Sequence, residues 1–385
     1  MKEKLKELKQ YPLLVLFFLF IFCFMIADGL WPKRAESDLE RRDLAQFPKF
    51  SFSSLVKNEW TAKYGEYTKD QVIERDSWLK AQSLCESLLF RKEEIGGAMI
   101  GKNDALFTKM FALTPTEEKL LQKNTTLVQQ FIEKFPGQVT FLLAPSSSVI
   151  NAEELPANTP MLDENARLDT IFSTVGEANS LDLREPFTAA KDDVQLYYDT
   201  DHHWTSYGAY LAYQQFCQMR GLTPMEVSES DYTTVPGFYG TTYSKALYRK
   251  SKPDTIAYLD LPNAMTIWNV SPTFELTENF TATMYDKSKL ETGDKYAMFL
   301  YGNNGYSTIE GDGEGSILVV KDSYANSFIP YLTANYARIG VIDPRGFGLS
   351  VADFAQQEGY DEVLLLFNFQ SFKESTFLSC LNITN

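Results

Sequence analysis

Histidine, cysteine and positive charge are all scarce in this 385-residue sequence, and each shortage excludes a class of function. Only two histidines occur, adjacent at His202 and His203, so any imidazole chemistry must take place at one point of the chain. The 4 cysteines form neither a CxxC motif nor a Cys/His cluster, which argues against a zinc site and a disulfide scaffold. A net charge of −15 argues against nucleic acid as a partner. The 44% of hydrophobic residues provides for a large core, in one big domain or two ordinary ones.

The N-terminal region contains an uncharged apolar run over residues 11–27, preceded by a lysine-rich tail over residues 1–10. The run is at the lower limit for a membrane-spanning helix, exceeds the usual signal-peptide core, and lacks a convincing cleavage site. We therefore expect an uncleaved transmembrane anchor with a cytoplasmic tail and an extracytoplasmic body. Residues 28–59, with little periodicity, are predicted to form a stalk. With the body outside, the three cysteines beyond the membrane form one bridge or none: Cys85, Cys217 and Cys380.

The body, residues 60–385, reads as strands alternating with helices, which predicts an α/β fold with a parallel sheet covered on both faces. Residues 99–107 read as a hairpin that turns at 102–104. Residues 222–300 lack long periodic stretches and are predicted to form a polar inserted lobe. Helices are expected over 60–92, 116–134, 167–179 and 205–220. Strands are expected over 139–144, 180–183, 316–320, 338–342 and 362–367.

The two histidines lie in a short polar block directly before a predicted helix, with Asp199 and Asp201 close by. A carboxylate beside an imidazole fixes the tautomer of the ring and supports the imidazolium that forms when the ring takes up a proton. This pattern suits a general base. A helix-capping cluster with two ordinary surface histidines accounts for the same residues.

A second polar block follows the apolar strand over residues 317–320, where Asp322 and Ser323 open a predicted helix. Ligands of parallel α/β sheets bind at the carboxyl ends of strands, and a helix N-terminus offers backbone N–H groups to a developing oxyanion. Ser323 therefore stands where a nucleophile would be exposed, although Asp322 or Ser323 is equally explained as a simple helix cap. The strand over residues 363–367 ends in Asn368 at the same edge, while a GxSxG elbow is absent.

Together these blocks resemble a known family. The motif Asp201-His202-His203-Trp204 is typical of the DHHW proteins, within the SGNH-like group that includes the alginate O-acetylation enzymes. Five further segments resemble sequence segments characteristic of this family, and together they extend the resemblance over most of the body. They begin at Glu40, Asp70, Ala144, Phe238 and Gly302.

The resemblance implies a circularly permuted SGNH hydrolase-like fold, a flavodoxin-like three-layer parallel sheet. It implies that Asp201 orients His203, that His203 is the general base and that Ser323 is the nucleophile. Asn368 and Gly346 are the corresponding oxyanion candidates. Asp199 with His202 gives an alternative pairing, which the register of Trp204 disfavours. The family's characteristic places and the aromatic residues of the lobe also supply substrate-binding candidates: Trp204, Tyr239, Tyr243, Asn303 and Asn304.

The resemblance implies a serine-dependent O-acetyltransferase or acetylesterase that acts on a cell-surface polysaccharide or cell-wall glycan. No cofactor and no metal are expected, because the sequence shows no ligand set for either. An extracellular glycan, the membrane and a membrane-bound acyltransferase that delivers the acetyl group are the expected partners. A non-catalytic glycan-binding or assembly protein that retains the fold is the alternative, and the Lys-Asp-Ser sequence at 321–323, in place of Gly-Asp-Ser, is what favours it.

Overall fold

The N-terminal part of the chain forms its own compact unit in the computed structural model, which describes residues 11–382. This unit ends at Phe90, and a second compact unit begins at Arg91. Helix α2 (Pro12–Leu30) has the length and apolar composition needed to cross a membrane, and none of its residues is buried in the protein. It starts within the predicted anchor and continues three residues beyond it.

The rest of the first unit consists of short elements: β1 (Glu36–Ser37), β2 (Arg42–Asp43), α3 (Phe52–Val56), α4 (Glu59–Asp70) and α5 (Arg75–Leu88). The region expected as one helix over 60–92 is broken in two, because the chain turns at Glu74 with a left-handed φ of 54°. Residues 60–90 also group with the N-terminal unit, whereas the sequence placed the start of the body at residue 60.

The second unit begins with the small antiparallel sheet of β3 (Glu94–Ile95), β4 (Ala98–Ile100) and β5 (Leu106–Thr108). Its turn lies at η1 (Lys102–Asp104), so the hairpin predicted over residues 99–107 is confirmed. Helix α6 (Pro115–Lys134) follows and starts with a capping box, in which Thr114 and Glu117 satisfy each other's backbone N–H groups.

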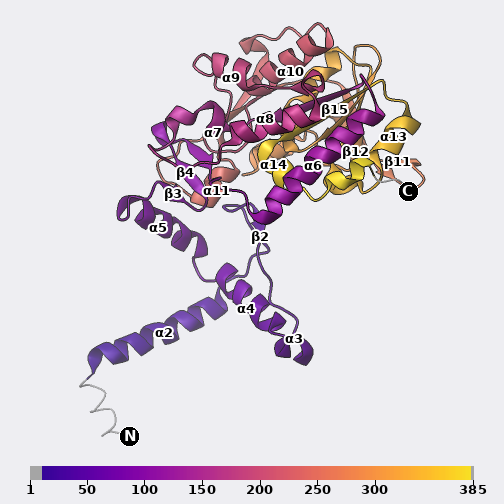
Figure 1. Ribbon diagram of the computed structural model, residues 1–385. Helices are drawn as coiled ribbons and strands as arrows, with labels where there is room; N and C mark the ends of the chain where they lie inside the picture. The colour runs from indigo at the N-terminus through magenta and orange to yellow at the C-terminus, as the bar shows by residue number, and fades with distance from the viewer. Residues whose placement is uncertain (1–10, 383–385) are drawn as a thin grey trace. The chain divides into compact units, whose positions relative to one another are not determined.

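The main sheet, in which β11, β12 and β15 are labelled in Figure 1, has the strand order β11-β10-β12-β14-β13-β15-β6-β7. Its parallel part consists of β14 (Arg338–Ile342), β13 (Ser316–Lys321), β15 (Glu362–Asn368), β6 (Val139–Ala144) and β7 (Ser180–Leu181). If β13 is counted as the first strand, this order becomes 2-1-3-4-5, which is that of a flavodoxin-like sheet. Because the chain enters at β6, the fourth strand of that order, the fold is circularly permuted as predicted.

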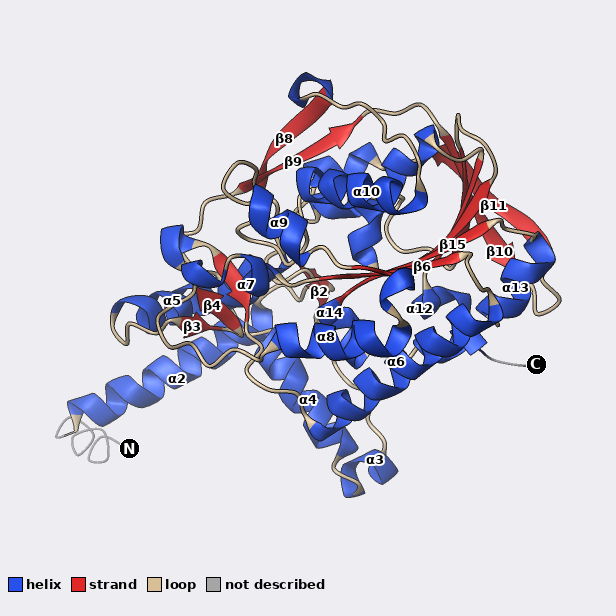
Figure 2. Cartoon of the chain, turned by 45° about the horizontal axis from the view of Figure 1, so that its top comes forward, coloured by secondary structure: helices blue, strands red, loops and turns tan. Residues whose placement is uncertain are grey.

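Both faces of the sheet are covered, which gives three layers (Figure 2). Alternate side chains of each strand enter different cores: Ile317 and Val319 of β13 join one core, and Leu318 and Val320 join the other. Helices α9 (Arg184–Ala190) and α10 (Ser206–Arg220) cover the first face. Helices α6, α8 (Glu164–Val175), α13 (Val351–Glu358) and α14 (Phe369–Glu374) cover the second.

Residues 222–300, predicted to form a polar inserted lobe, contribute two strands to the main sheet. Strands β10 (Ala264–Val270) and β11 (Leu276–Thr283) extend the sheet through β12 (Tyr306–Glu310). Strands β8 (Tyr232–Phe238) and β9 (Asp254–Leu259) form a separate antiparallel pair, with α11 (Thr241–Ala246) between them in the chain. Strand β11 is largely exposed, so it lacks the apolar alternation by which a half-buried strand is recognised.

The remaining short helices connect these elements. They are α7 (Ser147–Ile150), α12 (Pro344–Phe347), η2 (Ala152–Glu154), η3 (Glu177–Asn179), η4 (Glu229–Asp231), η5 (Lys287–Glu291), η6 (Lys295–Met298), η7 (Ser323–Ser327), η8 (Ile329–Ala334) and η9 (Leu378–Asn382). All four cysteines of the chain are free thiols in this structure, so the bridge left open by the sequence is not formed.

Candidate active site

The serine block lies at the carboxyl end of β13. Asp322 caps η7 by accepting the backbone N–H of Tyr324 at 2.9 Å, and Ser323 is the first residue of that short helix. The first N–H groups of a helix have no partner within it, so the Ser323 N–H is available at this position. Ser323 is half-buried, whereas Asp322 and Tyr324 are buried.

Trp204 holds the histidine block next to the serine block, and Thr205 starts the helix that follows it. Thr205 caps α10 by accepting the N–H of Gly208, and an isolated β-bridge joins Tyr197 to Trp204. The fully buried indole of Trp204 donates its Nε1–H to the Tyr324 carbonyl at 2.8 Å. This bond connects the two blocks directly, although they are 120 residues apart in the chain.

Asp201, His203 and Ser323 form a continuous chain of hydrogen bonds. Asp201 Oδ1 lies 2.5 Å from His203 Nδ1, and His203 Nε2 lies 2.8 Å from Ser323 Oγ. With a proton on Nδ1, His203 donates to the carboxylate and presents the Nε2 lone pair to the serine hydroxyl. The geometry is that of a nucleophile, its base and the group that orients the base.

A second segment secures the other oxygen of Asp201. Asp201 Oδ2 accepts the backbone N–H of Thr241 at 2.6 Å and its hydroxyl at 3.1 Å. A Cβ at Gly240 would lie 2.1 Å from Asp201 Cβ, so only glycine permits this approach. Burial by itself would raise the pKa of Asp201, but the charges of His203 and His202, with hydrogen bonds from His203 and Thr241, hold that pKa well below its usual range.

Tyr296 was not a site candidate in the sequence, yet it contacts two members of the chain of hydrogen bonds. Its ring stacks on His203 with 3.9 Å between centroids and 14° between planes, and its hydroxyl donates to the Ser323 carbonyl at 3.0 Å. Tyr296 comes from η6, within the region expected to form a lobe. No local motif marks Tyr296, whereas Thr241 ends the family-like segment that begins at Phe238, without a role assigned to it from the sequence.

The alternative pairing of Asp199 with His202 has different surroundings. His202 Nδ1 lies 2.6 Å from Thr241 Oγ1 and 3.4 Å from Asp201 Oδ1. Burial, and then the charge of Glu154, raises the pKa of Asp199, which is the opposite of what an imidazolium partner would do. The imidazole that reaches Ser323 is His203.

Both oxyanion candidates have their donors engaged. The Asn368 amide donates to Asp322 Oδ2 at 2.6 Å and to Ser371 Oγ at 2.8 Å, which uses both of its protons. The Gly346 N–H donates to the Asp343 carbonyl at 3.0 Å as part of the turn of α12. In this arrangement the Ser323 N–H is the donor that the site presents, and Asn368 must turn away from a partner before it can join.

Three of the predicted substrate-binding residues make contacts within the protein, although Asn303 is exposed and Asn304 half-buried. Trp204 is fully buried, which removes its indole from the reach of a glycan. Asn303 accepts a hydrogen bond from Lys321 Nζ at 2.7 Å, and Asn304 donates to the Leu300 carbonyl at 2.8 Å. The half-buried rings of Tyr239 and Tyr243 pack against each other with 4.3 Å between centroids. These two tyrosines remain substrate candidates.

The structure gathers three potential metal donors that the sequence pattern did not suggest as a site. Ligand atoms of Asp201, His202 and His203 lie within 4.8 Å of one another. Both ring nitrogens of His203 are already hydrogen-bonded, one to Asp201 and one to Ser323. A metal ion bound to His203 would therefore have to replace one of these two contacts.

Comparisons with known proteins match the region that contains this site. The sequence profile of the DHHW protein family matches residues 179–342. The profile described as SGNH hydrolase-like domain, acetyltransferase AlgX, matches residues 98–239. A probable alginate O-acetylase AlgJ of Pseudomonas syringae pv. tomato is 23% identical over 200 residues, which are 50% of this chain and 51% of that protein. The match thus spans about half the length of this relative.

Solved structures share the fold. A DHHW family protein from Eubacterium siraeum superposes with a TM-score of 0.64 and 21% identity, over 76% of this chain and 98% of that chain. PatB1 of Bacillus cereus superposes with a TM-score of 0.55 and 18% identity, over 73% of this chain and 98% of that one. These findings confirm the predicted resemblance of the chain to the DHHW protein family, with an SGNH hydrolase-like fold.

Proposed function

We propose that this protein is a membrane-anchored, extracytoplasmic serine enzyme that transfers or hydrolyses an acetyl ester on a cell-surface glycan. The observation that carries the proposal is the hydrogen-bonded sequence Asp201–His203–Ser323 at the carboxyl edge of the sheet. The match to a probable alginate O-acetylase supports acetyl as the acyl group. The apolar helix α2 supports the anchor.

In the first half of the reaction, Ser323 Oγ attacks the carbonyl carbon of a bound acetyl ester while His203 Nε2 takes the hydroxyl proton. The carbonyl oxygen becomes an oxyanion, which the Ser323 N–H stabilises. When the bond from the carbonyl carbon to the leaving oxygen breaks, His203 returns its proton to that oxygen. Asp201 stabilises the imidazolium that exists between these two steps.

In the second half, an acceptor hydroxyl attacks the acetyl group on Ser323, and His203 removes the proton of that hydroxyl. The bond from the carbonyl carbon to Ser323 Oγ then breaks, and His203 gives the proton back to the serine. A sugar hydroxyl as acceptor makes the protein a transferase, and water makes it an esterase. Both reactions use the same three residues.

A sulfonyl fluoride tests the activated serine directly, because sulfur forms a stable bond to a nucleophilic oxygen and releases fluoride. A PatB1 structure of Bacillus cereus contains a sulfonyl adduct, which supports the choice of reagent. With the full chain in detergent micelles, we expect mass spectrometry to find one adduct, on Ser323. Ser148→Ala, which removes a serine hydroxyl of helix α7, should be labelled as the parent is, whereas Ser323→Ala should not be labelled. Equal labelling of Ser323→Ala would contradict the proposal.

A further inference from the structure

A cavity of about 390 Å³ opens beside the serine block, at the carboxyl ends of β13, β14 and β15. The chain passes from β13 to β14 on one side, and β15 lies on the other side of β13. The cavity therefore lies at the topological switch point, where doubly wound sheets bind their ligands. Its size is within the range of small-molecule sites.

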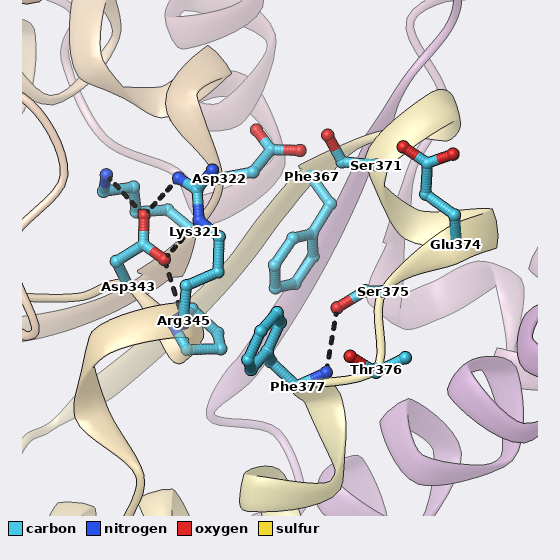
Figure 3. Close-up of a pocket in the computed structure, with 11 residues that line it drawn as sticks. Lys321, Asp322, Asp343, Arg345, Phe367, Ser371, Glu374, Ser375, Thr376 and Phe377 are labelled. Carbon is cyan, nitrogen blue, oxygen red and sulfur yellow. Dashed lines mark hydrogen bonds and ion pairs between the residues drawn. The ribbon is translucent and has the colours of Figure 1, made fainter. Parts of the chain in front are cut away.

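The lining of the cavity combines aromatic faces with hydroxyl groups (Figure 3). The rings of Phe367 and Phe377 lie in the middle, and Phe377 is 48% exposed although it is a large apolar side chain. Ser371, Ser375 and Thr376 lie on the segment that follows β15. An apolar ring face surrounded by hydroxyl donors and acceptors matches the two faces of a pyranose, whose C–H groups are apolar and whose rim is polar.

The charges of the cavity largely cancel. On one side the single carboxylate of Asp343 pairs with Arg345 at 2.5 Å and with the buried Lys321 at 3.2 Å, so each of the two cations has an ion-pair partner within the protein. The carboxyl groups of Asp322 and Glu374 also line the cavity. No unpaired cation among the lining residues is thus available to an anionic sugar, and the net charge of −15 repels one.

The cavity is also connected to the candidate oxyanion residue. Asp322 and Ser371, which line it, are the two residues that hold the Asn368 amide. Asn368 in turn lines the narrow cavity that contains Asp201 and His202. From these observations we infer that the cavity is the subsite for one uncharged sugar ring of the acceptor glycan, an inference that rests on the proposed function.

The experiment measures acceptor binding apart from catalysis. Ser323→Ala protein in detergent micelles is titrated calorimetrically with a neutral N-acetylglucosamine tetramer and with a uronic acid tetramer. Adding Phe377→Ala to this background should weaken binding of the neutral tetramer about tenfold, which is the loss of one aromatic contact. Phe377→Tyr should restore it. Phe280→Ala removes an equally exposed ring, 43% accessible on β11, and should leave binding unchanged.

Transfer kinetics give the second readout in the protein with Ser323 intact. Phe377→Ala should raise the KM for the neutral acceptor more than it lowers kcat. Unchanged affinity for the neutral tetramer in Phe377→Ala, or equally tight binding of the uronic acid tetramer, would overturn the subsite. Hydrolysis of an aryl acetate by the parent protein tests the proposed function separately, because that substrate contains no sugar.

Discussion

Asp201 and Glu164 are equally buried carboxyl groups of the same compact unit, each with 2% of its surface exposed. Their pKa values nevertheless shift in opposite directions. Imidazole and backbone partners hold the pKa of Asp201 well below its usual range. Burial raises the pKa of Glu164 to about 7, against one backbone N–H bond from Ser146 at 2.8 Å. Its Oε2 has no partner within the described residues. Partners, rather than burial, therefore decide whether a buried acid of this protein stays charged.

We expect the largest effect from removing Ser323, the proposed nucleophile that Asp201 assists through His203. Ser323→Ala should lower the hydrolysis of an aryl acetate by about 10³-fold or more, because losing one member of a triad removes nearly all that the unit provides. Initial rates with the full chain in micelles measure this. Ser148→Ala is the matched control. Parent-like rates in Ser323→Ala would show that neither Ser323 nor the charged Asp201 behind it is used in ester hydrolysis.

Asp201→Asn tests the charge itself, since the amide keeps the shape of the carboxylate. The neutral side chain no longer stabilises the imidazolium and can accept from His203 or donate to it, so the tautomer is no longer fixed. We expect a loss of about 10²-fold in kcat, smaller than that of Ser323→Ala. Circular dichroism checks that the fold survives. A loss below twofold would show that the buried charge of Asp201 is not used in catalysis.

Glu164→Gln tests the other half of the comparison through stability. A carboxyl group whose pKa rises on folding, from 4.5 to about 7, favours the folded state when protonated. Its contribution is complete below pH 4.5 and disappears as the pH rises through 7. The parent should therefore lose about 2–3 kcal/mol of unfolding free energy from this group between pH 5 and pH 8.

Urea unfolding of the parent and Glu164→Gln at both pH values measures that difference. The variant should show a smaller fall in stability with pH than the parent. Glu177→Gln, which alters an exposed acid on η3, is the control and should behave as the parent does. Identical pH dependence in the parent and Glu164→Gln would show that Glu164 stays ionised in the fold.

Chelation should have the smallest effect on activity. Both nitrogens of His203 are used within the site, so we expect dialysis against EDTA to leave aryl acetate hydrolysis unchanged. Zinc added to the dialysed protein should not increase the rate. Activity that EDTA removes and zinc restores would instead assign Asp201, His202 and His203 to a metal ion.

The sequence predicts those helices and strands that a local pattern of apolar and capping residues marks. The strands of the parallel sheet are continuous apolar runs, and α10 lies between a Thr205 cap and Gly221, so these elements are found where they were expected. The adjacent pair His202 and His203 restricts the base to one place. Strand β13, which ends directly before Asp322, marks the sheet edge where the proposed nucleophile Ser323 lies.

What the sequence misses is what only the fold brings together. Thr241 reaches Asp201 across 40 residues, and Tyr296 reaches His203 across more than 90, and nothing in the sequence shows that either contact exists. Strand β11 lies at the sheet edge and most of its residues are exposed, so its composition resembles that of a loop. Lys321 differs from the usual glycine, and its buried partner Asp343 is visible only in three dimensions.

The central claim is that His203, and not its neighbour, serves Ser323. Two single substitutions separate them, because these are the only imidazoles of the chain. We measure the aryl acetate hydrolysis of His203→Ala and His202→Ala side by side, in micelles, with folding checked for both. We expect a loss of about 10³-fold for His203→Ala and a loss below about tenfold for His202→Ala. An inactive His202→Ala beside an active His203→Ala would contradict it and assign the base to the pair Asp199 and His202.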